Sequence, residues 1–275
     1  MRRVLWVVPA CLIAGCSPVP DGGSQLSVPS LEAVTVVKAL KPAEPSGGAL
    51  ERLPAADPVA FVERCLERYE REVSCYRATL IKQERIKGQL GAEEEIEVHF
   101  RERPFSVLME WKRGHKLARK TMYVDGAHEN QIVVQLAGWR ALVGQVTVPV
   151  DDEDAKATSR YPINEFGMAV GTRRALAAWR QARERGDLRV ALQGTSQVPE
   201  LGGRECWVVH STHAPGRDPE GVVDTTYHFD TETWLQTGTV LRDDKGQLVG
   251  RYHFRAVEIN PAFDDKTFCR ERLKK

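Results

Sequence analysis

Apolar and polar residues alternate strictly over one segment of this chain after another. Ile96, Val98 and Phe100 are spaced two apart, and the same spacing runs through the range 105–111. Turn signals such as Asp125-Gly126 separate these segments. A period of two places alternate side chains on opposite faces of a strand, so the pattern predicts an antiparallel meander with one apolar face. We expect an α+β, mostly β fold, built on a large and strongly curved sheet.

Two segments carry a helical period instead. Asp57-Pro58 offers an N-cap carboxylate followed by proline at the first helical position. Apolar residues then recur at three- and four-residue steps over the range 61–73, which indicates one buried stripe. Thr172–Arg185 is predicted as a second helix, with Leu176 and Trp179 on its inner face. These two helices are expected to cover the sheet.

A curved sheet with only two helices does not easily fill its own concavity, and such shapes leave a pocket or groove. We predict that apolar residues of consecutive strands line this concavity and bind an apolar ligand. Trp and Met are large, adaptable side chains suited to that role. The alternative, that these residues simply pack against the helices, has equal weight. The predicted ligand-binding residues are Phe105, Val107, Met109, Trp111, Met122, Val124, Ile132 and Val134.

The N-terminus has the three parts of a bacterial export signal. Arg2-Arg3 is positively charged, Val4–Leu12 is apolar but too short to span a bilayer permanently, and Ile13–Cys16 resembles the lipobox of bacterial lipoproteins. This resemblance implies that residues 1–15 are removed and that Cys16 carries lipid, which anchors the protein to a membrane. Ser17 favours the outer over the inner membrane by resemblance to the enteric sorting rule. We therefore expect a periplasm-facing, lipid-anchored location in the cell envelope.

Residues 16–56 are rich in Pro, Gly, Ser and Ala, a composition typical of a flexible tether. The range 57–275 is long enough for one β-rich domain with a sizeable core. The formal net charge is +1, so no strong electrostatic field favours nucleic acid as a partner. The expected partners are the membrane, through the N-terminal lipid, and a lipid or lipoprotein ligand.

Four cysteines remain once Cys11 is cleaved off and Cys16 is lipidated. An oxidising compartment permits two disulfides among them, in three possible connectivities. The simplest pair joins Cys65 to Cys75, and four buried free thiols are an equally weighted alternative. The four are Cys65, Cys75, Cys206 and Cys269.

Sequence motifs for catalysis or metal binding are weak, so we expect no enzyme activity, no cofactor and no metal. His228 and His253 lie on separate predicted strands near Asp230, but solvated surface histidines are the favoured interpretation. Asp151, Asp152 and Asp154 lack the spacing and the glycine of an EF-hand loop. The carboxylates of the range 93–97 are interpreted as a solvent face. No G-x-S-x-G occurs, and Cys206 and His210 are too far apart along one strand to form a dyad.

Four sequence blocks resemble a bacterial family known as domain-of-unknown-function family 1571. They lie in the ranges Tyr76–Gly88, Arg101–Val107, Tyr123–Gly126 and Arg160–Gly167, and the resemblance covers about residues 57 to 190. The order of strands, with the late Asn260-Pro261, is also similar to the LolA/LolB lipoprotein-carrier superfamily. That resemblance implies an incomplete antiparallel barrel covered by helices, with acyl chains held in the concavity, and supplies no catalytic residues.

Two functions are consistent with these patterns. The first is a membrane-anchored envelope lipoprotein that binds an apolar ligand, either a lipid or an acylated protein, in the concave face. The second is a structural or sensory envelope protein with a filled interior and a protein partner. The volume of the cavity distinguishes them, because only the first needs a continuous apolar cavity of several hundred cubic ångströms.

Overall fold

The twelve strands found in the described residues form one antiparallel sheet. The computed structural model describes residues 56–115, 117–153, 157–218, 221–264 and 266–274. The predicted signal peptide, Cys16 and the predicted tether up to residue 55 lie outside these residues. Strand order is β7-β6-β5-β4-β3-β1-β12-β11-β10-β9-β8, with β2 paired to β1 beside this path. The bounds are β1 Cys75–Ile86, β2 Gln89–Leu90, β3 Glu94–Arg101, β4 Ser106–Arg113, β5 Ala118–Val124, β6 Ile132–Leu136, β7 Gln145–Val148, β8 Arg189–Val198, β9 Arg204–Thr212, β10 Asp224–Asp230, β11 Gln236–Arg242 and β12 Leu248–Ile259.

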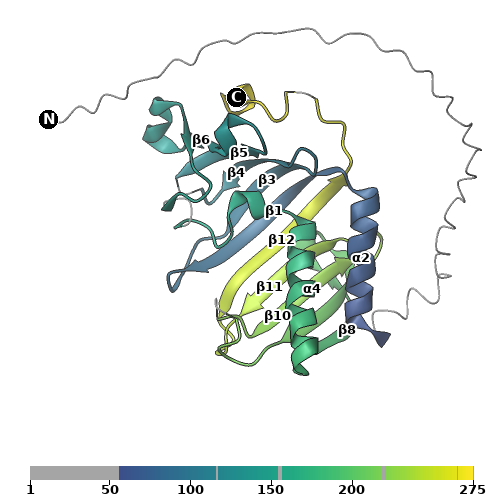
Figure 1. Cartoon of the computed structure of the whole chain (residues 1–275). Coiled ribbons are helices and arrows are strands. Elements are labelled where there is room, and N and C mark those ends of the chain that lie inside the picture. Colours follow the sequence, from purple (N-terminus) through teal and green to yellow (C-terminus); the bar gives the residue numbers. More distant parts are fainter. Residues whose placement is uncertain (1–55, 116, 154–156, 219–220, 265, 275) are drawn as a thin grey trace, which may run out of the picture. The chain divides into compact units, whose positions relative to one another are not determined.

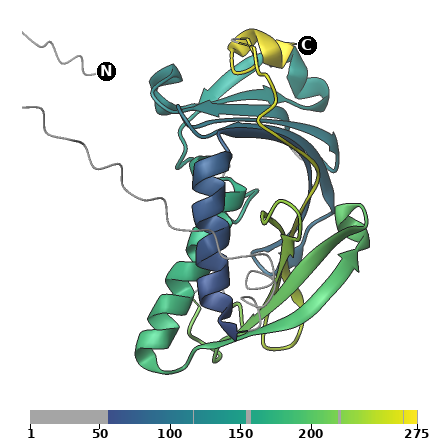
Figure 2. The ribbon, with the colours of Figure 1, turned by 90° about the vertical axis from the view of Figure 1, so that its right-hand side faces the viewer.

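The sheet curves strongly and does not close. The first strand of the meander, β1, pairs with β3 on one side and with the last strand, β12, on the other, so the sheet grows outward from its centre. β7 and β8 form its two edges. Figure 2 shows the curvature from the side, with both long helices inside the curve. This architecture confirms the predicted fold class, including the curved, incomplete barrel. β7 lies in a stretch for which no strand was predicted.

Two long helices, α2 (Pro58–Glu72) and α4 (Met168–Arg185), lie side by side on the concave face (Figure 1). The Asp57 side chain caps α2 by accepting hydrogen bonds from the backbone N–H groups of Val59 and Ala60. α4 begins four residues earlier than predicted and ends at Gly186, which adopts the left-handed conformation of a helix C-cap. Both predicted helices are therefore present. Short 3₁₀ turns span η1 His128–Asn130, η2 Gly138–Val143, η3 Ile163–Glu165 and η4 Pro199–Leu201.

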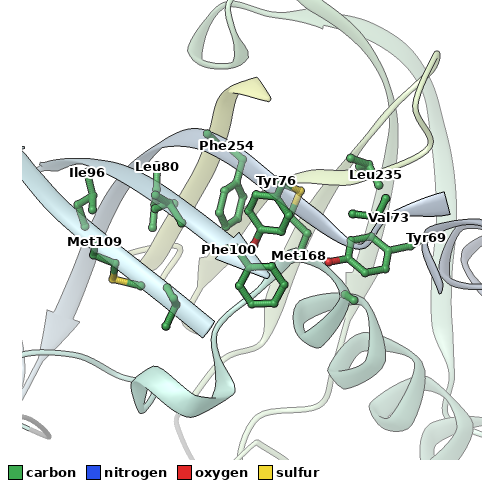
Figure 3. Close-up of a cluster of buried hydrophobic side chains, with 14 of the residues drawn as sticks. Tyr69, Val73, Tyr76, Leu80, Ile96, Phe100, Met109, Met168, Leu235 and Phe254 are labelled. Atoms are coloured by element: carbon green, nitrogen blue, oxygen red, sulfur yellow. The ribbon is translucent and has the colours of Figure 1, made fainter. Parts of the chain in front are cut away.

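Beneath the helices, aromatic side chains fill one half of the concavity. Trp179 is fully buried, and its indole N–H donates to the Ser211 hydroxyl at 3.1 Å. Phe61 packs edge-on against Phe229, with ring centroids 5.4 Å apart. A second cluster lies at the centre of the sheet, where Tyr76 stacks on Phe100 at 4.7 Å (Figure 3). The helices thus cover the concavity over β8–β12 without filling all of it, while the half formed by β3–β7 is left without a covering helix.

The convex face of β4–β6 is covered by the end of the chain. Phe268 and Leu273 are buried there, and Leu273 belongs to the short helix α5 (Arg270–Lys274). α5 contacts β5 and β6 (Figure 1). The apolar residues of the chain end therefore pack on the sheet, while its basic residues Arg270 and Lys274 are exposed.

Candidate functional site

A cavity of about 1310 Å³ lies on the concave face. Its walls are formed by strands on both sides of β1, by the first half of α4, and by the segment that connects β7 to α4. Gly167, the residue before α4, has a φ of +132°, and a Cβ built on it would lie 3.3 Å from the ring of Phe100. A glycine at this position therefore lets α4 begin close against the central cluster. The cavity occupies the part of the concavity that the helices do not fill.

Four of the predicted ligand-binding residues line this cavity. Met109 and Trp111 come from β4, and Ile132 and Val134 come from β6. Each pair is spaced two residues apart, so both members point to the same face of the sheet. Phe105 and Val107 do not line the cavity, but they belong to the same buried apolar cluster as Met109. Six of the eight residues thus lie on the predicted face.

Met122 and Val124 lie on the opposite face, which corrects the prediction for these two residues. Met122 pairs with Leu108 in the register of β4 and β5, and both belong to the cluster buried under the chain end. Tyr123 pairs with Val107 and is the β5 residue that faces the cavity, together with Thr121. Both faces of β5 are buried, so hydrophobicity alone does not indicate which residues point inward.

The strand wall of the cavity contains a buried polar cluster, which the sequence interpretation missed. Lys82 and Glu84 of β1 and Glu94 of β3 line the wall and are each at least nine-tenths buried. The Lys82 ammonium nitrogen lies 3.2 Å from the nearer Glu84 oxygen and 3.7 Å from Glu94. The interpretation of the range 93–97 as a solvent face is therefore wrong for Glu94, which shares its face with Ile96 and Val98. The same parity extends from Leu80 to Lys82 and Glu84, and this is the signal that could have identified them.

Two aromatic donors hold the carboxylates in place. The Tyr252 hydroxyl donates to Glu84 at 2.7 Å, and the Trp111 indole N–H donates to Glu94 at 2.6 Å. Burial, followed by the negative charge of Glu84, raises the pKa of Tyr252 well above its usual value, so this hydroxyl stays protonated and remains a donor. The cluster is preorganised, because strand pairing sets Lys82 opposite Glu94 on one side and opposite Tyr252 on the other.

Two residues of the cavity lining carry buried polar atoms that have no hydrogen-bond partner. The Gln236 side-chain oxygen and the Thr121 hydroxyl are buried, line the cavity and have no hydrogen-bond partner within the protein. Buried polar atoms of this kind need a partner, from water or from a bound molecule. An apolar wall that contains a buried polar cluster suits a molecule with both an apolar chain and a polar head.

His228 and His253 meet on the convex face, and the favoured interpretation of solvated surface histidines is wrong. Their ring centroids are 5.8 Å apart, and His253 is buried. Both pair in register with Gly238 of the strand between them, whose missing side chain leaves room for the rings. Asp230 does not join them, because it binds the Arg204 guanidinium at 2.6 and 2.9 Å. Within the described residues, no three ligand-type side chains gather as a metal site requires.

The four cysteines, all within the described residues, are free thiols in the structure, so the Cys65–Cys75 pairing is not observed. Cys65 lies on the buried face of α2, while Cys75 at the start of β1 contacts the Pro261 carbonyl. Burial raises the pKa of the Cys206 thiol to about 11, so at neutral pH it is protonated and a poor nucleophile. Within the described residues no helix is both long and apolar enough to cross a membrane. Asp154 of the acidic loop lies outside the described residues.

Comparison with solved structures gives several matches of similar fold at low identity. The MucA/MucB complex of Pseudomonas aeruginosa matches with 18% identity, over 77% of this chain and 60% of that chain, with a TM-score of 0.46. The lipoprotein LppX of Mycobacterium tuberculosis matches with 14% identity over 76% of this chain and 100% of that one, with a TM-score of 0.44. A LolA superfamily protein from Nitrosomonas europaea matches with 7% identity over 77% of this chain and 98% of that one, with a TM-score of 0.34.

This chain spans about three-fifths of the length of the MucB structures it matches. No curated protein matches it in sequence. A family model described as "Protein of unknown function (DUF1571)" matches residues 73–272. The match therefore extends beyond the four blocks that carried the resemblance and includes the strands β8–β12 as well as the chain end.

Proposed function

Because this chain belongs to the DUF1571 family, whose description names no activity, we propose its function from its own geometry. The protein binds an amphiphile, either a lipid or the acyl chain of a lipidated protein, in the concave cavity. The observation that carries this proposal is a cavity of about 1310 Å³ whose strand wall combines apolar side chains with the buried cluster of Lys82, Glu84 and Glu94. The ligand's chain would lie along Met109, Ile132 and Val134, with its polar head toward Lys82 and Glu84.

The size of the cavity supports ligand binding over a filled interior. Pockets for small molecules usually measure about 300–1,000 Å³, and this cavity exceeds that range. A structural or sensory protein would have no need of so large a space. The polar cluster supports binding rather than catalysis, because Lys82 is paired with both carboxylates and each carboxylate accepts an aromatic donor.

Native mass spectrometry of the chain from Ser17 onward, purified from its host without the Cys16 lipid, tests this function. We expect a co-purified species of lipid mass that is released on collisional activation. The Met109→Glu variant, purified in the same way, should lack that species. A wild-type protein that carries no such species and also fails to bind an added acyl probe would refute the proposed function.

We further propose that a lipid on Cys16 anchors the protein in the envelope, with the outer membrane favoured. Replacing Cys16 by Ser should move the protein from the membrane to the soluble periplasmic fraction, after a salt wash that removes peripheral attachment. The physical reason is that several acyl chains on one residue give stable anchoring. Cell fractionation measures this, and Cys11→Ser in the apolar leader is the matched control, which should stay in the membrane. Persistent membrane association of the Cys16→Ser protein would exclude the lipid as the sole anchor.

A further inference from the structure

An exposed apolar tip lies at one end of the sheet, in the 3₁₀ turn η2 between β6 and β7. Trp139 is 77% exposed, Leu142 90% and Val143 66%, the highest values among the large apolar residues that the structure describes. Single exposed apolar side chains are ordinary on protein surfaces, but three within five residues, one of them Trp, are not. These side chains contribute nothing to the core, so their exposure needs another explanation.

Basic residues lie beside this tip. The Arg140 guanidinium lies over the Trp139 ring, 5.4 Å from its centroid. The side-chain amide of Gln145, the first residue of β7 and two residues beyond the end of η2, donates to the backbone carbonyl of Arg270 at 2.7 Å, so the strand that follows η2 is bonded to the start of α5. α5 carries Arg270, Arg272 and Lys274 against the single acidic residue Glu271. Apolar side chains, an interfacial Trp and neighbouring cations are the combination that binds anionic lipid surfaces.

The tip is continuous with the rim of the cavity. Leu136, at the end of β6, lines the cavity and lies two residues before the start of η2. Leu117 also lines it, is 38% exposed, and its carbonyl accepts a hydrogen bond from the Ala137 N–H at 2.8 Å. Val146, three residues beyond Val143, lines the cavity from β7. The exposed apolar residues therefore lead directly to the cavity wall.

We infer that η2 and α5 together form a docking surface for an anionic membrane, which places the mouth of the cavity at the lipid. Trp139 and Leu142 enter the interface between head groups and chains, while Arg140 and the basic residues of α5 contact lipid phosphates. The purpose of this surface rests on the proposed function, because it would give an amphiphile a short path between bilayer and cavity. The docking itself is a separate property and can be measured separately.

Vesicle co-sedimentation tests the inference, using the chain from Ser17 onward so that neither the lipid nor the apolar leader contributes. Wild-type protein should bind phosphatidylcholine vesicles that contain phosphatidylglycerol, and should bind less as salt is raised. The double variant Trp139→Ser, Leu142→Ser should lose at least tenfold in partitioning. The matched control is Leu90→Ser, which removes another exposed apolar side chain, 43% exposed at the β1–β2 hairpin, and should leave partitioning unchanged.

A second variant tests the basic residues. Arg270→Ser with Lys274→Ser should weaken binding to anionic vesicles and remove most of its salt dependence. Circular dichroism and thermal melting confirm that each variant is folded, and acyl-probe binding in solution should persist in all of them. Loss of docking with retained probe binding would leave the proposed function intact.

Three results would overturn the inference. One is equal partitioning of the Trp139→Ser, Leu142→Ser variant and wild type. Another is absence of wild-type binding to anionic vesicles. The third is a wild-type protein that is dimeric in solution and does not bind vesicles, together with a monomeric Trp139→Ser, Leu142→Ser variant. The tip would then contact a second copy of the chain and not a membrane.

Discussion

Replacing Met109 by Glu is expected to weaken binding of a fluorescent acyl probe about a hundredfold, with the fold retained. Met109 lines the cavity wall from the middle of β4 and is nearly buried. The variant loses an apolar contact with the acyl chain of the probe and places a carboxylate beside it, and together these changes reduce the binding free energy by about 3 kcal/mol. Each 1.4 kcal/mol is a factor of about ten in affinity. Fluorescence titration of the probe measures the dissociation constant.

The matched control is Met109→Leu, which keeps the volume and apolar character of the side chain. Its affinity should stay within about threefold of wild type, since a difference below about 0.7 kcal/mol has that effect. If Met109→Glu does not fold, Val134→Asn on β6 tests the same wall from another strand. Unchanged probe affinity in a folded variant would show that this wall does not bind the acyl chain.

The sheet was predictable because alternation of apolar residues is a local signal. Ile96, Val98 and Phe100 fix the inner face of β3, and the helix stripe from Phe61 to Val73 fixes the face of α2 in the same way. What the sequence does not give is the set of long-range pairings. β1 lies between β3 and β12 in the sheet, although β12 is distant from it along the chain. Lys82 of β1, for example, pairs with Tyr252 of β12, about 170 residues later, and no local pattern indicates this register.

The site was only partly predictable, and for two different physical reasons. On β5 both faces are buried, since the chain end covers Met122 and Val124, so hydrophobicity favoured the wrong face. In the polar cluster, Lys82, Glu84 and Glu94 stand at inward positions. Charged residues are usually exposed, so Glu94 was interpreted as part of a solvent face and the other two were not identified. Their burial depends on each other and on Tyr252 and Trp111, which come from different strands. A polar cluster of this kind exists only after the strands have paired.

Acidification is expected to destabilise the protein between pH 6.5 and about 4 through the buried histidine pair. The pKa of His253 is lowered from 6.5 to about 4, mainly by burial. The neighbouring His228 and Arg251 act in the same direction as burial, and Glu200 acts against them. Burial also lowers the pKa of His228, and Arg242 lies on the wall of the same small pocket. Neither His253 ring nitrogen has a hydrogen-bond partner within the protein. Both rings are therefore expected to be neutral in the folded protein at pH 7.

The direction of the pH effect depends on which state, folded or unfolded, binds the proton at the higher pH. Above pH 6.5, His253 is neutral in the folded and the unfolded chain, so it adds no pH dependence. Between pH 6.5 and 4 the unfolded chain binds a proton that the folded chain excludes, so the free energy of unfolding falls as pH is lowered. For His253 alone the fall reaches about 3 kcal/mol when pH 4 has been passed, at 1.36 kcal/mol for each pH unit by which the pKa is lowered.

Urea unfolding at a series of pH values from 7 to 4 measures this fall. The variant His253→Phe removes the titrating group and keeps a ring in the space above Gly238, so its free energy of unfolding should decline by about 2–3 kcal/mol less than that of wild type. The matched control is His115→Gln, which removes an exposed histidine and should follow the wild-type curve. Parallel curves for wild type and His253→Phe would mean that His253 binds its proton as readily in the folded chain as in the unfolded one.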